Sequence, residues 1–243
     1  DRFAYALRMG VVKENPCSRI VLPERQESEK KIFTIEETQA FLDALDGEPL
    51  RYVVFFVLAI FGGYRREELL GFEFRDFNFT TNVVTVEHVS LYDPAHGIFT
   101  GPPKTARSHR SLKLPVWIFD MVKALRAEQS MRRMELGDQW HESGRLFTKL
   151  DGSPARPGDF YDWGKELCKR HGLPWYGIHQ FRHLNASLLI ANHTDVRTVS
   201  AALGHSQTST TLNIYSHAFE TAQAEASVGL AAALPVNFGK KKA

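Results

Sequence analysis

The strongest fold signal in the chain is LRYVVFFVLAIFGGYRREELLGF, residues 50–72. Its first part, Leu50 to Phe61, carries apolar side chains on nearly every face of a helix, which is typical of a helix buried on all sides. Gly62 and Gly63 end this helix, and Arg65 begins the next element. We therefore expect a core helix that is followed directly by a charged segment.

The pattern around this helix predicts a mainly α fold with one small three-stranded antiparallel sheet (α+β). Thr34 and Glu37 form a capping-box pattern, so a helix is expected to begin at Thr34 and to end at Gly47. Further helices are expected over residues 3–12, after Pro115, and over 158–171, 179–191, 195–203 and 208–215. The strands are expected at 83–86, 97–101 and 111–114, with Lys104 in the turn between the second and the third.

Composition sets broad limits on function. The chain has 243 residues, 43% of them apolar, which is enough for a real core. Its net charge of +2 does not by itself indicate a nucleic-acid binder. Cys17 and Cys168 lie far apart and in no metal-like spacing, which favours a reducing cytoplasm over a disulfide framework. The longest apolar run, Val53 to Phe61, is far shorter than the ~20 residues of a membrane helix, so we expect no membrane partner.

Three parts are expected along the chain. Residues 23–31 are rich in charge and predict a linker between residues 1–22 and a main domain at 32–243, which ends in a C-terminal helix and tail. Because the chain begins at Asp1 inside a predicted helix, we expect an N-terminal part to precede it. Residues 222–234 are apolar on one face, which suits packing on this domain and on a neighbouring copy equally well.

The functional prediction depends on six polar residues, which are, in chain order, Arg65, Lys104, His179, Arg182, His205 and Tyr215. Together they are what is needed to break a phosphodiester without a metal or another cofactor. A tyrosine hydroxyl can attack phosphorus, arginines can hold the charge that develops on the phosphoryl oxygens, and lysine and histidine can move protons. Ionising a free tyrosine at pH 7 costs about 4 kcal/mol, which nearby positive charge would offset.

Each of these residues alone also has a structural interpretation. His179 would then be a satisfied structural histidine, and Arg182 a surface ion-pair partner. His205 would form a local hydrogen bond at a helix end, and Tyr215 would be a core tyrosine. Lys104 would belong to a basic hairpin that touches DNA phosphates or only water. The functional interpretation therefore depends on the combination.

Further residues are expected to support this set. Glu68 lies three residues after Arg65 and is expected to hold an arginine fork in place, because bidentate arginine–carboxylate pairs fix geometry. Four basic positions are predicted to contact DNA: Arg66, Arg107, His109 and Arg110.

His179 and His183 lie four residues apart, a spacing that metal ligands use. The segment has no HExxH pattern, no cysteine joins it, and the positive charge of Arg182 would repel a metal ion. We therefore expect no metal site. A metal hydrolase stays an alternative, and its activity would be lost to chelators.

Four segments together resemble the tyrosine recombinase (phage integrase) family: GYRREELLGF (63–72), the Lys104 hairpin, HQFRHLNASLL (179–189) and LGHSQTSTTLNIY (203–215). The resemblance covers about residues 32–220, and it is closest to integrases of phages and conjugative transposons of Gram-positive-type bacteria. It implies the catalytic-domain fold of that family, and it makes residues 1–22 the remnant of an N-terminal core-binding domain.

The resemblance implies site-specific DNA recombination that integrates or excises a mobile element. Tyr215 would attack the scissile phosphate and give a 3′-phosphotyrosine and a free 5′-hydroxyl. Arg65 and Arg182 would bind the non-bridging oxygens. Resealing would reverse these steps, so neither ATP nor a metal would be required.

Proton transfer would fall to the other residues. Lys104 would protonate the leaving 5′ oxygen, His179 would assist proton transfer at the tyrosine, and His205 would hydrogen-bond the phosphate. The implied partners are double-stranded DNA at attachment sites, further copies of the chain in a tetramer, and an accessory excision or DNA-bending protein. The implied location is the bacterial cytoplasm, at the nucleoid when DNA is bound.

Two other functions would use parts of the same set. A type IB topoisomerase would cut and reseal DNA with the same residues as a monomer, without paired sites. A non-catalytic DNA-binding regulator would use the helices of residues 195–215 as a reading head, and Tyr215→Phe would leave its output unchanged.

Overall fold

The computed structural model describes residues 2–20, 31–103, 105, 108–205, 207–209, 211–212, 215, 219 and 223. The chain divides into two compact units, Asp1–Lys30 and Lys31–Ala243. In the first unit, helix α1 spans Arg2–Arg8 and a short 3-10 helix spans Pro16–Arg19. The predicted linker at 23–31 and the predicted C-terminal helix at 222–234 lie almost wholly outside the described residues.

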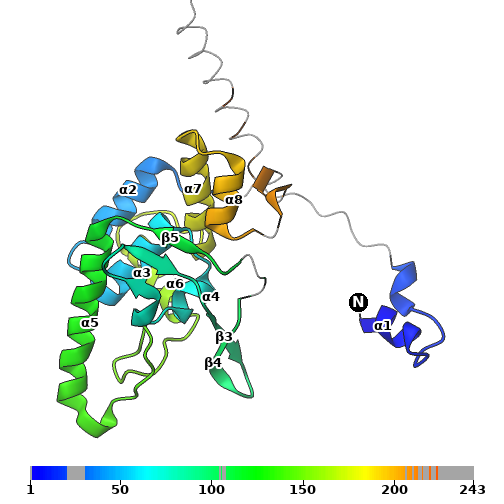
Figure 1. The fold of residues 1–243 in the computed structure, drawn as a ribbon, viewed down its shortest axis with the longest axis horizontal. Helices are drawn as coiled ribbons and strands as arrows, with labels where there is room; N and C mark the ends of the chain where they lie inside the picture. Colours follow the sequence, from blue (N-terminus) through cyan, green and yellow to red (C-terminus); the bar gives the residue numbers. More distant parts are fainter. Residues whose placement is uncertain are drawn as a thin grey trace, which may run out of the picture. The chain divides into compact units, whose positions relative to one another are not determined.

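The second unit is mainly helical and has two small antiparallel sheets (Figure 1). Its helices are α2 Ile35–Ala44, α3 Leu50–Gly62, α4 Arg66–Gly71, α5 Val116–Leu136, α6 Asp159–Arg170, α7 Ile178–Ala191 and α8 Val196–Leu203. Its strands are β1 Phe77–Asn78, β2 Val83–Thr85, β3 Val89–Asp93, β4 Gly97–Gly101 and β5 Ser111–Lys113. The predicted fold class, mainly α with a small antiparallel sheet, is confirmed.

Helix α3 is the central core helix that its sequence predicts. All of its residues from Val54 to Ile60 are buried, and it packs against both α5 and α7. Figure 1 shows α3 in the middle of the unit, with α5 running along one side. Gly63 ends the helix in the left-handed conformation, with φ +58°, and a Cβ atom there would come within 2.7 Å of the Asn185 side chain on α7. This glycine therefore allows α7 to approach the chain directly before Arg65.

Aromatic packing fixes α7 against the start of the unit. The predicted capping box of α2 is confirmed, because the Glu37 amide donates to Thr34 Oγ1 at 3.1 Å and the Thr34 amide donates to the Glu37 carboxylate at 2.9 Å. Just before this cap, the Phe33 ring stacks on Phe181 of α7 with ring centroids 4.6 Å apart. Phe181 is fully buried. The residue that follows it, Arg182, is therefore held on a rigid element.

The strands pair differently from the prediction. The three-stranded sheet has the order β1-β2-β5, with Val84 opposite both Phe77 and Leu112. The predicted strand at 97–101 pairs instead with Val89–Asp93 in a separate hairpin. A tight turn closes this hairpin, because Asp93 accepts hydrogen bonds from two following backbone amides. Lys104 therefore falls in sequence between strands of two different sheets, β4 and β5, rather than between two paired strands.

None of the helices in the described part of the chain is both long and apolar enough to cross a membrane.

Candidate active site

The site is built around the start of α4, where Arg65 and Glu68 bind each other. The Arg65 amide donates to Glu68 Oε2 at 2.8 Å, and its guanidinium Nη1 donates to Oε1 at 2.7 Å. Glu68 is only 1% exposed, whereas the Arg65 side chain is 32% exposed. The predicted arginine–carboxylate pair is thus present in the structure, with the carboxylate inside the protein and the guanidinium reaching toward its surface.

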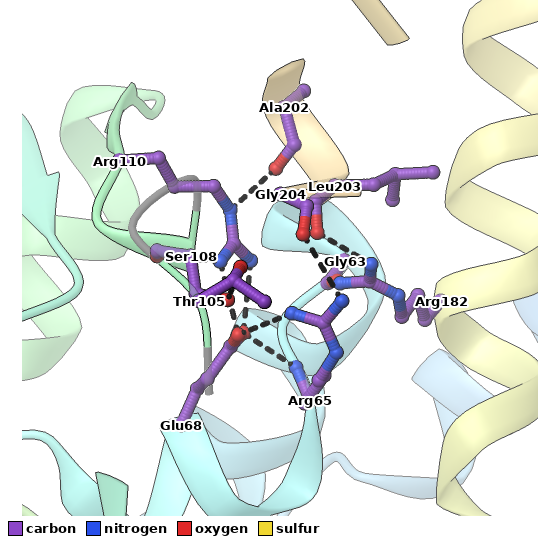
Figure 2. Close-up of polar contacts among 10 residues, drawn as sticks. All are labelled: Gly63, Arg65, Glu68, Thr105, Ser108, Arg110, Arg182, Ala202, Leu203 and Gly204. Carbon is purple, nitrogen blue, oxygen red and sulfur yellow. Dashed lines mark hydrogen bonds and ion pairs between the residues drawn. The ribbon is translucent and has the colours of Figure 1, made fainter. Parts of the chain in front are cut away.

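Arg110 completes the binding of the Glu68 carboxylate (Figure 2). Its Nη1 donates to Glu68 Oε1 at 3.0 Å and its Nη2 donates to Oε2 at 2.8 Å, which is a bidentate pair. Burial alone would raise the pKa of Glu68. The hydrogen bonds and charge of Arg110, together with Arg65, more than offset burial, so the pKa lies below its usual value. Glu68 is therefore a buried carboxylate ion that fixes two guanidinium groups.

The end of α8 holds the guanidinium groups from the other side. Ala202 O accepts from Arg110 Nε at 2.6 Å, and Gly204 O accepts from Arg65 Nη2 at 3.1 Å. The carbonyl between them, Leu203 O, accepts from Arg182 Nη2. The last carbonyls of a helix lack partners within the helix and carry its partial negative charge. Three successive carbonyls thus orient three arginines (Figure 2).

Arg182 is the most deeply buried of these arginines. It is 2% exposed, and its Nη1 donates to Gly63 O at 2.8 Å. Burial, and next the charge of Arg65, lower the pKa of Arg182 to about 9, which leaves it charged at neutral pH. Two guanidinium groups therefore bind the Glu68 carboxylate, and a third, that of Arg182, lies near enough for the charges of Arg65 and Glu68 to act on it. The three arginines and one carboxylate have two positive charges in excess. An anion with two negative charges would balance it.

A pocket opens beside this cluster. Its volume is about 400 Å³, and Arg65, Tyr161, Tyr176 and His179 are among its lining residues. His179 lies in the first turn of α7, where backbone N–H groups without helical partners favour an anion. Its ring meets that of His183 edge to face, with centroids 4.8 Å apart. Arg65 and His179 therefore line the same opening.

His205 is held next to the arginines as a neutral imidazole. It follows Gly204, its backbone amide donates to Ser200 O, and its Nδ1 lies 2.8 Å from Thr211 Oγ1. Burial, and next the charges of Arg182 and Arg65, lower the pKa of His205 to about 4. At neutral pH this ring therefore has one N–H group to donate and adds no further charge.

Tyr215 lies in a small second core between α7 and α8. Its ring packs with Ile190, Val199 and Leu203, and the residue is 5% exposed. Its hydroxyl oxygen lies 2.7 Å from His183 Nδ1. Burial raises the pKa of Tyr215 to about 12, although the charge of Arg182 acts in the opposite direction. The tyrosine is thus un-ionised here and its hydroxyl is directed at a histidine.

Nothing in the sequence pairs His183 with Tyr215. The two residues are 32 positions apart and meet only because Tyr215 packs against α7 in the folded protein. The one sequence signal at His183 was its metal-like spacing from His179. In the described part of the chain, no three His, Cys, Asp or Glu side chains form a group that could hold a metal ion.

The remaining predicted residues fall into three groups. Lys104 and Arg107 lie outside the described residues. Arg66 and His109 are at the surface, where Arg66 pairs with Glu67 at 3.1 Å and His109 lies 3.7 Å from Glu87. Arg110 was predicted to contact DNA, but its guanidinium is buried and binds Glu68 and Ala202 O inside the protein.

Comparison with known proteins agrees with this geometry. The model of the phage integrase family matches residues 31–222. A tyrosine recombinase XerC-like protein of Caldanaerobacter subterraneus subsp. tengcongensis is 31% identical over 232 residues, which cover 88% of this chain and 59% of that protein. The ICEBs1 integrase of Bacillus subtilis is 25% identical, over 92% of this chain and 60% of that protein.

Solved structures share the fold. The Tn1549 transposon integrase in complex with transposon right end DNA superposes with a TM-score of 0.74 at 22% identity, over 92% of this chain and 74% of that chain. The present chain spans about three fifths of the length of the two relatives above. The family model matches most of the chain, and the fold is that of a solved integrase. The chain therefore belongs to the phage integrase family of tyrosine recombinases.

Proposed function

We propose that the protein is a site-specific DNA recombinase that cleaves and rejoins strands through a 3′-phosphotyrosine at Tyr215. One observation carries this proposal. Arg65 and Arg110 bind one buried carboxylate, and Arg182 is held beside them by two backbone carbonyls, so the cluster has two positive charges in excess and the charge of Arg182 acts on Tyr215. Family membership supports it, because the relatives are recombinases, integrases and transposases by name.

The arginines would stabilise the pentavalent transition state. Arg65 and Arg182 would donate to the non-bridging oxygens with the N–H groups that their carbonyl partners leave unused, since a guanidinium carries five. Their carbonyl and carboxylate partners hold them in place before the substrate arrives, so little reorganisation is needed during the reaction. His205, a neutral donor, would add a hydrogen bond to the same phosphate.

The other steps follow from the same chemistry. Lys104 would protonate the 5′ oxygen as it leaves, and His179 would assist proton transfer from the pocket that it lines. Rejoining would use a 5′-hydroxyl from another strand, and the phosphotyrosine would conserve the bond energy, so no ATP is consumed. The proposed partners are double-stranded attachment sites, further copies of the chain in a tetramer, and an accessory excision or bending protein. The substrate would be a mobile element, as the names of the transposon and ICEBs1 relatives suggest.

Covalent trapping tests the proposal. The protein is mixed in EDTA with nicked suicide duplexes tiled from the DNA around its gene, and the products are separated in SDS. We expect an SDS-resistant adduct whose DNA-linked peptide contains Tyr215. Absence of an adduct, both for this chain and for a longer form that extends it at the N-terminus, would contradict the catalytic proposal. Binding without cleavage would then favour a regulator, and rejoining by a monomer at single sites would favour a topoisomerase.

Arg182→Lys is expected to slow adduct formation on the order of 100-fold, because one ammonium group cannot replace a guanidinium that contacts two carbonyls and a phosphate. Single-turnover cleavage of the trapped duplex measures the effect. Arg170→Lys, in an exposed ion pair with Glu48, is the matched control and should cleave normally. If Arg182→Lys has the melting temperature and the cleavage rate of the wild type, Arg182 does not bind the transition state.

Lys104→Ala is expected to cleave an ordinary duplex poorly and to recover on a duplex whose 5′ bridging oxygen is replaced by sulfur. A thiolate leaves without a proton, so the general acid is no longer needed. The ratio of the two cleavage rates in the variant and in the wild type is the measurement. A variant equally slow on both duplexes would show that Lys104 does not protonate the leaving group.

A further inference from the structure

His183 holds the hydroxyl that would become the nucleophile. The Tyr215 oxygen lies 2.7 Å from His183 Nδ1, and the two rings are 5.7 Å apart. His183 is 7% exposed and Tyr215 is 5% exposed, so water competes little for this contact. The packing of the tyrosine ring against Ile190 and Leu203 fixes the position of its hydroxyl oxygen beside His183.

The neighbouring residues are poorer proton acceptors. Arg182 has only N–H groups and remains a cation. The pKa of His205 is lowered to about 4, first by burial, and its Nδ1 already faces Thr211. The family resemblance implies that His179 assists proton transfer at the tyrosine, but its ring lies edge to face against His183 and lines the pocket. The contact at the hydroxyl itself belongs to His183.

We propose that His183 is the general base that accepts the Tyr215 proton during strand cleavage. In this step the O–H bond of Tyr215 breaks and its proton passes to His183 Nδ1, while the phenolic oxygen forms a bond to phosphorus. The bond from phosphorus to the 5′ oxygen breaks at the same time, and that oxygen takes a proton from the general acid. In rejoining, the imidazolium returns its proton to the departing tyrosine. His183 must therefore begin as the neutral tautomer with its proton on Nε2.

A base is needed because the buried tyrosine resists ionisation. With a pKa raised to about 12, roughly one Tyr215 side chain in a hundred thousand would be ionised at pH 7. A positioned base that takes the proton during attack removes the need for a free phenolate, and such groups typically contribute about 100-fold to 10,000-fold in rate. His183 is in place for this before the substrate binds.

The inference rests on the proposed strand cleavage and is tested by His183→Gln. The amide oxygen of glutamine can still accept a hydrogen bond but cannot take the proton. We expect adduct formation on the suicide duplex to slow about 100-fold or more. His171→Gln, at the exposed end of α6, is the matched control and should react as the wild type does.

Fluorinated tyrosine at position 215 separates a base from a structural residue. Trifluorotyrosine has a more acidic phenol, so it depends less on a base. We expect it to restore most of the lost rate in His183→Gln and to change the wild-type rate much less. Equal effects of the fluorinated residue in the two proteins, or normal cleavage by His183→Gln, would overturn the inference.

The wild-type protein distinguishes failure of the proposed function from failure of the proposed role of His183. If it forms no adduct on any duplex, the proposed function itself fails. If it forms the adduct and His183→Gln does so equally fast, only the role of His183 fails. Thermal unfolding of each variant shows whether the fold is kept. His183→Asn, with a shorter amide, provides the same comparison if the glutamine variant does not fold.

Discussion

Tyr215→Phe is expected to form no covalent adduct with DNA and to bind the same duplex with unchanged affinity. The substitution removes the attacking oxygen and keeps the ring that packs against Val199 and Leu203. It leaves the buried His183 without its hydroxyl partner, which costs about 1–3 kcal/mol of folding free energy. The variant should therefore fold, melt slightly earlier than the wild type and be inactive.

Gel separation in SDS measures the adduct, and equilibrium binding at a stated salt concentration measures the affinity. Tyr52→Phe is the matched control, since it also removes a hydroxyl that accepts a hydrogen bond, from Arg51 at 2.7 Å. That control should form the adduct at the wild-type rate. An SDS-resistant adduct in Tyr215→Phe would show that another residue is the nucleophile.

Glu68→Gln is expected to lower the free energy of unfolding by about 3 kcal/mol, because it leaves the buried charge of Arg110 without a counter-ion. It should also slow cleavage, since Arg65 loses the partner that holds its guanidinium. Denaturant unfolding measures the first effect and single-turnover cleavage the second. Glu67→Gln changes the adjacent residue, whose ion pair with Arg66 is exposed, and should cost less than about 0.5 kcal/mol.

The effect of Glu68→Gln should depend on pH in one direction. The folded protein holds the pKa of Glu68 below its usual value, although burial alone would raise it. The stabilisation by this carboxylate is therefore complete above the pKa of the unfolded chain, and it is lost as the pH falls through the lower pKa of the folded state. The difference between wild type and Glu68→Gln should be largest near neutral pH and shrink in acid. A difference that grows in acid would contradict the assignment of Glu68 as an ion.

Local sequence patterns predicted most of the helices and the three expected strand segments, but not how the strands pair. The run from Leu50 to Phe61 and the cap at Thr34 specify helices through their own residues, and both were confirmed. Strand partners depend on contacts between distant residues. Phe77–Asn78, with only two residues, has no alternation to detect, yet it is the third strand of the sheet, while 97–101 pairs elsewhere.

Contacts between residues close in sequence were predictable in the site as well, and contacts between distant residues were not. Arg65 and Glu68 are three residues apart, so their pairing follows from one helix turn. Arg110 was predicted to contact DNA because it lies in a basic run, and nothing in that run signals a buried carboxylate 42 residues earlier in the chain. The same limit hid the contact between His183 and Tyr215. The roles of the six predicted catalytic residues stay predictions until the variants are measured.

The contacts of the arginines with the end of α8 turn the length of this helix into a constraint. The accepting carbonyls belong to Ala202, Leu203 and Gly204, and each residue along a helix turns the chain by about 100° and advances it by ~1.5 Å. One residue inserted or deleted after Asp195 would present different carbonyls to all three guanidinium groups at once, although no charged side chain had changed. Protein engineering of this segment can therefore substitute residues on the outer face of α8 but cannot alter their number.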